Sequence, residues 1–112
     1  MCLGQQAIGE VYGGKLRNLD KVYHGVATEI KTVVNDTMLF NGLKKSFEVG
    51  RYHSWVVAKD SFPDTLEVTS VDENGQIMSL RHREYDVRGV QFHPESVLTP
   101  DGMKMLENWV NS

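Results

Sequence analysis

Apolar residues near the start of the chain recur at the spacing of one helical face. They are Leu3, Ala7, Ile8, Val11 and Tyr12. Gly13-Gly14 follows, and glycine readily adopts the left-handed conformation found just past a helix end. The pattern therefore predicts a helix over residues 3–12, with Cys2 at its N-terminal edge.

The middle of the chain is rich in β-branched and aromatic residues, which favour strands. Strands are predicted at residues 22–23, 29–34, 47–51, 55–58, 66–71, 76–81 and 87–93. Asn74-Gly75 separates two of these runs and is a strong hairpin signal. Pro94 ends the last run. Residues 36–43 are expected to hold one short helical turn.

The C-terminal residues predict a second helix. Thr99 is its candidate N-cap, and Pro100 suits a first turn. Its expected apolar stripe consists of Met103, Leu106, Trp109 and Val110. The predicted order is a helix, several mostly antiparallel strands, one more strand and a helix, which indicates an α/β chain.

Composition and charge exclude some classes of function. The chain has 112 residues, a common size for one domain, and a formal net charge of -3 without a basic run, which argues against nucleic-acid binding. The longest apolar stretch, residues 55–58, is too short to cross a membrane, and the N-terminus lacks a signal-peptide pattern. A single cysteine cannot form an internal disulfide, so the cytoplasm is the default location.

Cys2 lies where the first helix is expected to begin. The dipole and unpaired N–H groups of a helix N-terminus favour a thiolate, which is the nucleophilic form. Gly4 leaves room for a substrate, and the N–H of Leu3 would point at the oxyanion formed on attack, as in a nucleophile elbow. Taken alone, these residues are a weak signal, and they favour a partly buried structural thiol.

The end of the last predicted strand is a second candidate for chemistry. Strand alternation places Gln91 and His93 on one face, and Pro94 ends the strand at the histidine. Glu95 is close enough in sequence to accept a hydrogen bond from one imidazole nitrogen, which leaves the other nitrogen for a thiol. Without Cys2, these residues would indicate a surface turn.

Together the two motifs resemble those of the class I, or triad-type, glutamine amidotransferases. The matching segments are Cys2-Leu3-Gly4-Gln5-Gln6-Ala7-Ile8-Gly9-Glu10 and Gly89-Val90-Gln91-Phe92-His93-Pro94-Glu95-Ser96. Residues 13–16, 24–25, 51–54 and 81–85 resemble one branch, the glutaminase subunits of anthranilate synthase and aminodeoxychorismate synthase. The resemblance covers essentially all of the chain and implies the C-terminal part of a flavodoxin-like α/β fold, with a mixed sheet, a mostly antiparallel second sheet and terminal helices.

The resemblance also implies roles for individual residues. Cys2 matches the nucleophile, His93 the general base and acid, and Glu95 the residue that orients His93. Leu3 supplies an oxyanion donor through its backbone, and Gln6 matches a side chain that contacts bound glutamine.

The glutamine α-substituents would be held by the backbone of Ser54 and Trp55. The family more often has Leu at the position of Trp55, and His or Met at the position of Gln5. The implied reaction is hydrolysis of glutamine through a thioester on Cys2, without metal or organic cofactor. The ammonia would pass to a chorismate-binding synthase partner, which uses it for anthranilate or aminodeoxychorismate synthesis.

The family has a further stretch before its cysteine, with parallel strands and a Gly-Pro-Gly loop that supplies a second oxyanion donor. We therefore expect residues 1–112 to form one glutamine amidotransferase type 1 domain that lacks its N-terminal strands. Two alternatives remain open. The chain could be a non-catalytic fragment that folds or self-associates through surface bared by the missing strands. It could also be another thiol hydrolase that acts on γ-glutamyl compounds.

Two other interpretations are weaker. An N-terminal cysteine can use its own α-amine as the base, but such enzymes do not need a His-Pro-Glu strand end. His24, His53 and His82 lack the short spacing of zinc ligands, so we expect ordinary hydrogen-bonded histidines.

Overall fold

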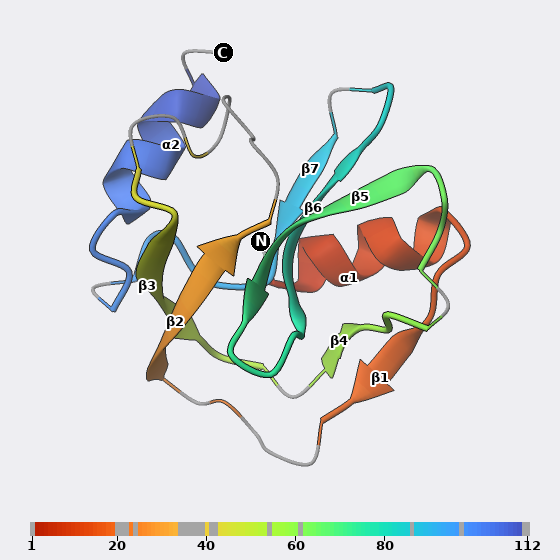
Figure 1. Ribbon diagram of the computed structural model, residues 1–112, viewed down its shortest axis with the longest axis horizontal. Helices are drawn as coiled ribbons and strands as arrows, with labels where there is room; N and C mark the ends of the chain where they lie inside the picture. The colour runs from red at the N-terminus through yellow and green to blue at the C-terminus, as the bar shows by residue number, and fades with distance from the viewer. Residues whose placement is uncertain are drawn as a thin grey trace.

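The computed structural model describes residues 2–19, 23, 25–33, 40, 43–53, 55–60, 62–85, 87–96 and 98–110. Within these ranges the chain begins and ends with a helix and forms strands between them (Figure 1). The elements in order are α1 (Cys2–Val11), β1 (Leu16–Asn18), β2 (Val26–Thr32), β3 (Ser46–Arg51), β4 (Trp55–Val57), β5 (Leu66–Asp72), β6 (Ile77–His82), β7 (Arg88–Val90) and α2 (Gly102–Val110).

The strands form two sheets. Five of them pair in the order β3-β2-β5-β6-β7, and β1 pairs with β4 in a separate two-stranded sheet. All of these described pairs are antiparallel, so the parallel pairs of the expected mixed sheet are not found in the described ranges. The α/β class and the antiparallel sheet are confirmed.

The predicted hairpin between β5 and β6 is confirmed, and its turn shows why. The Asp72 carboxylate accepts hydrogen bonds from the N–H groups of Asn74 and Gln76, at 2.9 and 2.8 Å. Gly75 has a φ of 78°, in the left-handed region that glycine tolerates at no steric cost. An aspartate before Asn-Gly thus stabilises the turn that sets the register.

Several element boundaries differ from the prediction. The strand expected at 29–34 begins earlier, at Val26, and the short strand β1 was not predicted. Tyr23 is not in a strand, and the helical turn expected at 36–43 falls mostly outside the described residues. The strand expected at 87–93 ends at Val90, and His93 forms an isolated antiparallel bridge with Gly50 instead.

The predicted start and apolar stripe of the last helix are wrong. The Thr99 hydroxyl does not cap α2, because it donates to the carbonyl of His93 and accepts from the N–H of Gly50, both at 2.7 Å. The buried residues of α2 are Gly102 and Met105, whereas Met103 is 67% exposed. The face of α2 with Gly102 and Met105 points inward, because Gly102 packs closely against the Pro94 backbone. Met103, Trp109 and Val110 are exposed.

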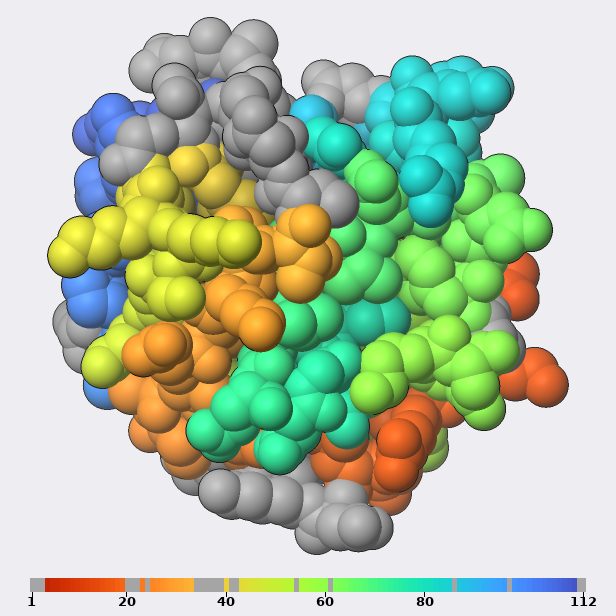
Figure 2. Space-filling model, in the orientation of Figure 1, coloured from red at the N-terminus to blue at the C-terminus, as the bar shows by residue number. Residues whose placement is uncertain are grey.

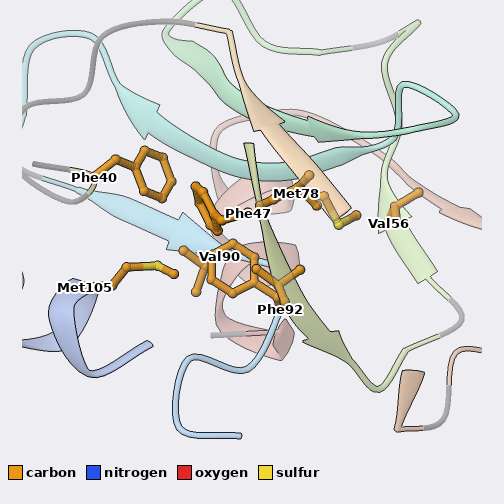
Figure 3. Packing of buried hydrophobic residues seen from close by; sticks show 9 residues of the cluster. Phe40, Phe47, Val56, Met78, Val90, Phe92 and Met105 are labelled. Carbon is orange, nitrogen blue, oxygen red and sulfur yellow. The ribbon is translucent and has the colours of Figure 1, made fainter. Parts of the chain in front are cut away.

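Two clusters of buried apolar residues lie against the sheets. The first joins β2, β3, β4, β6 and β7 to α2, and Figure 3 shows Met105 reaching from α2 toward Val90 and Phe47. The second cluster (Val57, Leu66, Ile77 and Leu80) packs against Ile8 and Tyr12 of α1. Val56 and Val57 are neighbours in β4 and belong to different clusters, because successive strand residues face opposite ways.

Helix α1 lies behind β5 and β6 in the view of Figure 1. The face shown in Figure 2 is covered by side chains of β2, β3, β5 and β6. In β2, exposed Glu29 and Lys31 alternate with buried Ile30, as expected for an antiparallel strand with one solvated face. No helix in the described ranges is long and apolar enough to cross a membrane.

Candidate active site

His93 and Glu95 form a hydrogen-bonded pair beyond the end of β7. Nδ1 of His93 lies 3.1 and 3.2 Å from the two carboxylate oxygens of Glu95. A carboxylate accepts hydrogen bonds, so Nδ1 carries a hydrogen, and in the neutral ring the lone pair is then on Nε2. The His93 side chain is 29% exposed, so Nε2 can meet a substrate or a thiol. This is the arrangement predicted for a general base and its orienting carboxylate.

The backbone of His93 is anchored to β3. Its N–H donates to the carbonyl of Gly50 at 3.0 Å, and its carbonyl accepts the Thr99 hydroxyl. The ring of Tyr52 meets the imidazole edge-on, with 4.9 Å between the ring centroids, and the Tyr52 hydroxyl lies 3.0 Å from the Ser96 hydroxyl. His93 lies outside the named strands, and it is held by its backbone hydrogen bonds and by the contact of its ring with Tyr52.

Close contacts at two glycines bring α1 onto β7, the strand that leads to His93, and onto β4. A Cβ on Gly89 of β7 would lie 3.1 Å from the Cα of Gln5. A Cβ on Gly9 would lie 2.8 Å from a methyl carbon of Val57 in β4. Cys2 is the first residue of α1, as expected, and the side chains of Cys2 and Leu3 are outside the described part of the structure. Their roles stay predictions.

The structure brings together two of the residues expected to contact glutamine. The buried Gln6 amide nitrogen donates to the backbone carbonyl of Trp55 at 3.0 Å, and it lies 3.5 Å from Oε1 of Gln91. The Trp55 side chain is half exposed. Ser54, the third expected residue, lies outside the described residues. Gln6 therefore links α1 to β4 and to the segment that carries His93.

A buried network next to Trp55 was not predicted from the sequence, which gave no sign that Arg51 and Asp72 are partners. Arg51 and Asp72 form an ion pair at 2.7 Å, with both side chains fully buried. Arg51 also donates from Nε to Nε2 of His53 at 3.0 Å. Burial and the neighbouring Arg51 lower the pKa of His53 from 6.5 to about 4, while its bond to the Trp55 backbone and the Asp72 charge oppose this and His93 adds slightly to it.

The histidines expected to be hydrogen-bonded are so where the structure describes them. His53 bonds as stated, and Nδ1 of His82 accepts from the N–H groups of Glu84 and Tyr85 at 3.0 Å. His24 lies outside the described residues. Within the described ranges no group of three or more His, Cys, Asp or Glu side chains is placed to hold a metal ion.

Comparisons with known proteins show the family to which the chain belongs. The family model of the class-I glutamine amidotransferases matches residues 1–112. The chain is 46% identical to the anthranilate synthase beta subunit 2 of rice (Oryza sativa), across 98% of this chain and 42% of the relative. It is 43% identical to the aminodeoxychorismate synthase component 2 of Escherichia coli, across 99% of this chain and 58% of the relative.

A similar fold occurs in a crystal structure from Thermoplasma acidophilum, described as that of a candidate GMP synthase subunit. The TM-score is 0.88 at 22% identity, over 98% of this chain and 53% of that one. The chain spans about half the length of the two curated relatives named above. The match over the whole chain and the identity to these relatives show that the protein belongs to the class-I glutamine amidotransferase family.

Proposed function

We propose that the chain carries the hydrolytic centre of a glutaminase that supplies ammonia to a chorismate-aminating synthase. The observation that carries the proposal is the His93–Glu95 pair, whose Nδ1 is engaged and whose Nε2 is left for a thiol. The family membership and the position of Cys2 at the first residue of α1 support the same interpretation. Residues 1–112 would form a single amidotransferase domain.

In this mechanism Nε2 of His93 takes the proton of the Cys2 thiol, and the resulting thiolate attacks the side-chain amide carbon of glutamine. The N–H of Leu3 donates to the oxyanion, a contribution of about 3 kcal/mol for one such donor. His93 protonates the departing ammonia from Nε2 and leaves a γ-glutamyl thioester on Cys2. His93 then takes a proton from water, which attacks the thioester and releases glutamate. Glu95 holds the imidazole in the tautomer that this exchange needs.

Glutamine would be bound through its α-amino and α-carboxylate groups by the backbone of Ser54 and Trp55. The Gln6 amide supports this segment, because it donates to the Trp55 carbonyl. This assignment places the reacting amide between α1 and His93. No metal or organic cofactor enters the chemistry.

The partner is inferred from the relatives, which are named as the second components of anthranilate and aminodeoxychorismate synthases. We propose that a chorismate-binding synthase partner accepts the ammonia. Both pathways stay open, because relatives of both kinds are similarly identical to the chain. A cytoplasmic location is proposed for the chain, while the rice relative is named as chloroplastic.

Labelling with a glutamine-mimicking chloroketone tests the proposal. The full-length protein in complex with its synthase partner is expected to be alkylated at Cys2, with loss of glutamine-dependent synthesis and retention of ammonia-dependent synthesis. If Cys2 is labelled but the protein supplies ammonia to no synthase, the result would favour another γ-glutamyl hydrolase. An unlabelled Cys2 would contradict the mechanism.

Mass in solution tests the fragment alternative. A monomer with glutaminase activity would rule out this alternative. An inactive, self-associating chain would support a non-catalytic fragment, and the exposed Met103, Trp109 and Val110 of α2 are the apolar surface that could associate.

A further inference from the structure

A buried ion pair joins Arg51, which shortly precedes the segment proposed to bind glutamine, to Asp72. The Arg51 guanidinium contacts the Asp72 carboxylate at 2.7 Å and lies 3.5 Å from the centre of the Tyr23 ring. Both charges are fully buried, and removing two charges from water offsets most of the attraction between them. The pair is therefore a poor source of stability, and its effect on its neighbour His53 is more informative.

Arg51 fixes the tautomer of His53. A guanidinium group has only donors, so the contact of 3.0 Å from Arg51 Nε requires a lone pair on Nε2 of His53. The hydrogen of the neutral ring must then be on Nδ1. Nδ1 lies 3.0 Å from the backbone carbonyl of Trp55, which can only accept. His53 is thus a donor to the Trp55 peptide because Arg51 donates to His53.

The ring of His53 also has little freedom to turn away. It stacks on Tyr23, with 5.4 Å between centroids and an angle of 19° between the ring planes. His53 and Tyr23 are both buried. Burial and the Arg51 charge lower the pKa of His53 to about 4, so the ring is neutral near pH 7.

The Trp55 carbonyl receives donors from two directions. Nδ1 of His53 approaches from the end of β3, and the Gln6 amide nitrogen approaches from α1, each at 3.0 Å. A carbonyl oxygen has two lone pairs, so both are used. The position of the Trp55 carbonyl is therefore set jointly by His53, which follows β3, and by Gln6 of α1.

We propose that His53 is a positioning residue for the substrate: as a neutral Nδ1–H donor whose tautomer is set by Arg51 and Asp72, it fixes the Trp55 carbonyl and thereby orients the Ser54 and Trp55 backbone that binds the α-substituents of glutamine. The inference rests on the proposed glutaminase function. It assigns the buried ion pair a role in substrate binding that acts through His53.

Two substitutions separate the donor from the acceptor of the ring. In His53→Asn, the side-chain amide nitrogen takes the place of Nδ1 and can still donate to Trp55. In His53→Gln, the amide oxygen takes the place of Nε2 and can still accept from Arg51, but the donor to Trp55 is lost. Comparing the two variants therefore distinguishes the hydrogen bond to the Trp55 carbonyl from the hydrogen bond to Arg51.

The assay is glutamine-dependent synthesis by the full-length protein in complex with its partner. His53→Gln is expected to raise KM for glutamine about 10-fold, with kcat lowered less than about 3-fold, because a loosened peptide weakens ground-state and transition-state binding alike. His53→Asn is expected to keep KM within about 3-fold of wild type. Ammonia-dependent synthesis measures the partner and should not change in either variant.

An unchanged KM in His53→Gln, or equal losses in both variants, would overturn the inference alone. A wild-type complex without glutaminase activity would instead overturn the proposed function, and the inference with it. If the variants do not fold, the ¹⁵N shifts of the His53 ring in the wild-type protein decide. Protonated Nδ1 and unprotonated Nε2 at about pH 6 are expected, since the pKa is about 4. An imidazolium ring or an Nε2–H tautomer would contradict the proposal.

Discussion

Gly102 packs directly against the turn that carries the candidate base, so Gly102→Ala should damage both stability and activity. A Cβ at this position would lie 1.7 Å from the carbonyl oxygen of Pro94 and 2.7 Å from its carbonyl carbon. Real Cβ contacts essentially never fall below 3.0 Å, so the atoms must separate by about 1.3 Å. Both neighbours are backbone atoms, so no flexible side chain can yield.

The movement must be shared between α2 and the His93–Glu95 turn. Moving α2 would withdraw Met105 from the first apolar cluster. Moving Pro94 would displace the residues on either side of it, His93 and Glu95. Overpacking of this kind costs about 1–3 kcal/mol. A misplacement of about 1 Å in a catalytic group can cost about 100-fold in rate.

We therefore expect Gly102→Ala to lower the free energy of unfolding by about 2–3 kcal/mol, measured by urea denaturation. We expect it to lower kcat/KM of the complex for glutamine by about 10- to 100-fold, an order-of-magnitude estimate from the same displacement. Met103→Ala, at the exposed next position of α2, is the matched control and should stay within about 0.5 kcal/mol of wild type. Helix propensity alone favours alanine by up to about 1 kcal/mol, the opposite sign. A Gly102→Ala variant as stable and active as wild type would refute the packing argument.

Three further changes have expected outcomes. Gln5→Met should raise the free energy of unfolding by about 1 kcal/mol in urea denaturation, because Oε1 of Gln5 is buried without a hydrogen-bond partner among the described residues. The bond lost from Nε2 of Gln5 to the Ile77 carbonyl is long, at 3.4 Å, so it offsets little of this gain; a loss of stability would contradict the reasoning. Gly4→Ala should raise the thermal midpoint of unfolding, because a Cβ there meets nothing within 4 Å and alanine favours helix. The same change should raise KM for glutamine, because the added methyl group crowds the proposed approach to Cys2. An unchanged KM would contradict that approach. The low pKa of His53 should make the free energy of unfolding fall as the pH drops from about 6.5 toward 4, because the unfolded chain takes up the proton first. The loss from this one group is at most about 3 kcal/mol. Urea denaturation at pH 7 and at about pH 4.5 should show a larger loss for wild type than for His53→Gln, and equal losses would contradict the assignment.

The parts of the fold that could be predicted from sequence have local causes. Helix α1 and the Asn74-Gly75 turn are set by residues close together in the chain, and both are confirmed. The apolar stripe predicted for α1 is wrong in part, because Ala7 and Val11 are exposed and the buried side chains of the helix include Gln5 and Gln6. The His93–Glu95 pair could be predicted for the same reason, because only Pro94 separates its members. The three residues of β1 were not recognisable as a strand, since so short a run shows no alternation and exists through its pairing with β4.

The errors arise where distant residues meet. Thr99 looks like a helix cap by sequence, but its hydroxyl joins Gly50 to His93, which is a contact between β3 and the segment after β7. Arg51 and Asp72 are 21 positions apart, and their burial follows from the pairing of β2 with both β3 and β5. The tautomer of His53 depends on that pair. Tertiary packing, rather than local pattern, therefore determines the support of the candidate site.

The most direct test of the account is the pH dependence of thiol alkylation, which reports whether the Cys2 sulfur lies beside the His93 imidazole. The chain has one cysteine, so iodoacetamide reads a single thiol. In the wild-type protein, the half-maximal rate is expected below about pH 8.5, the value for a free thiol. His93→Ala should raise the pH of the half-maximal rate and slow alkylation at pH 7 by about 10-fold or more, because the thiol loses its proton acceptor. Superimposable profiles for wild type and His93→Ala would show that the sulfur and the imidazole do not meet.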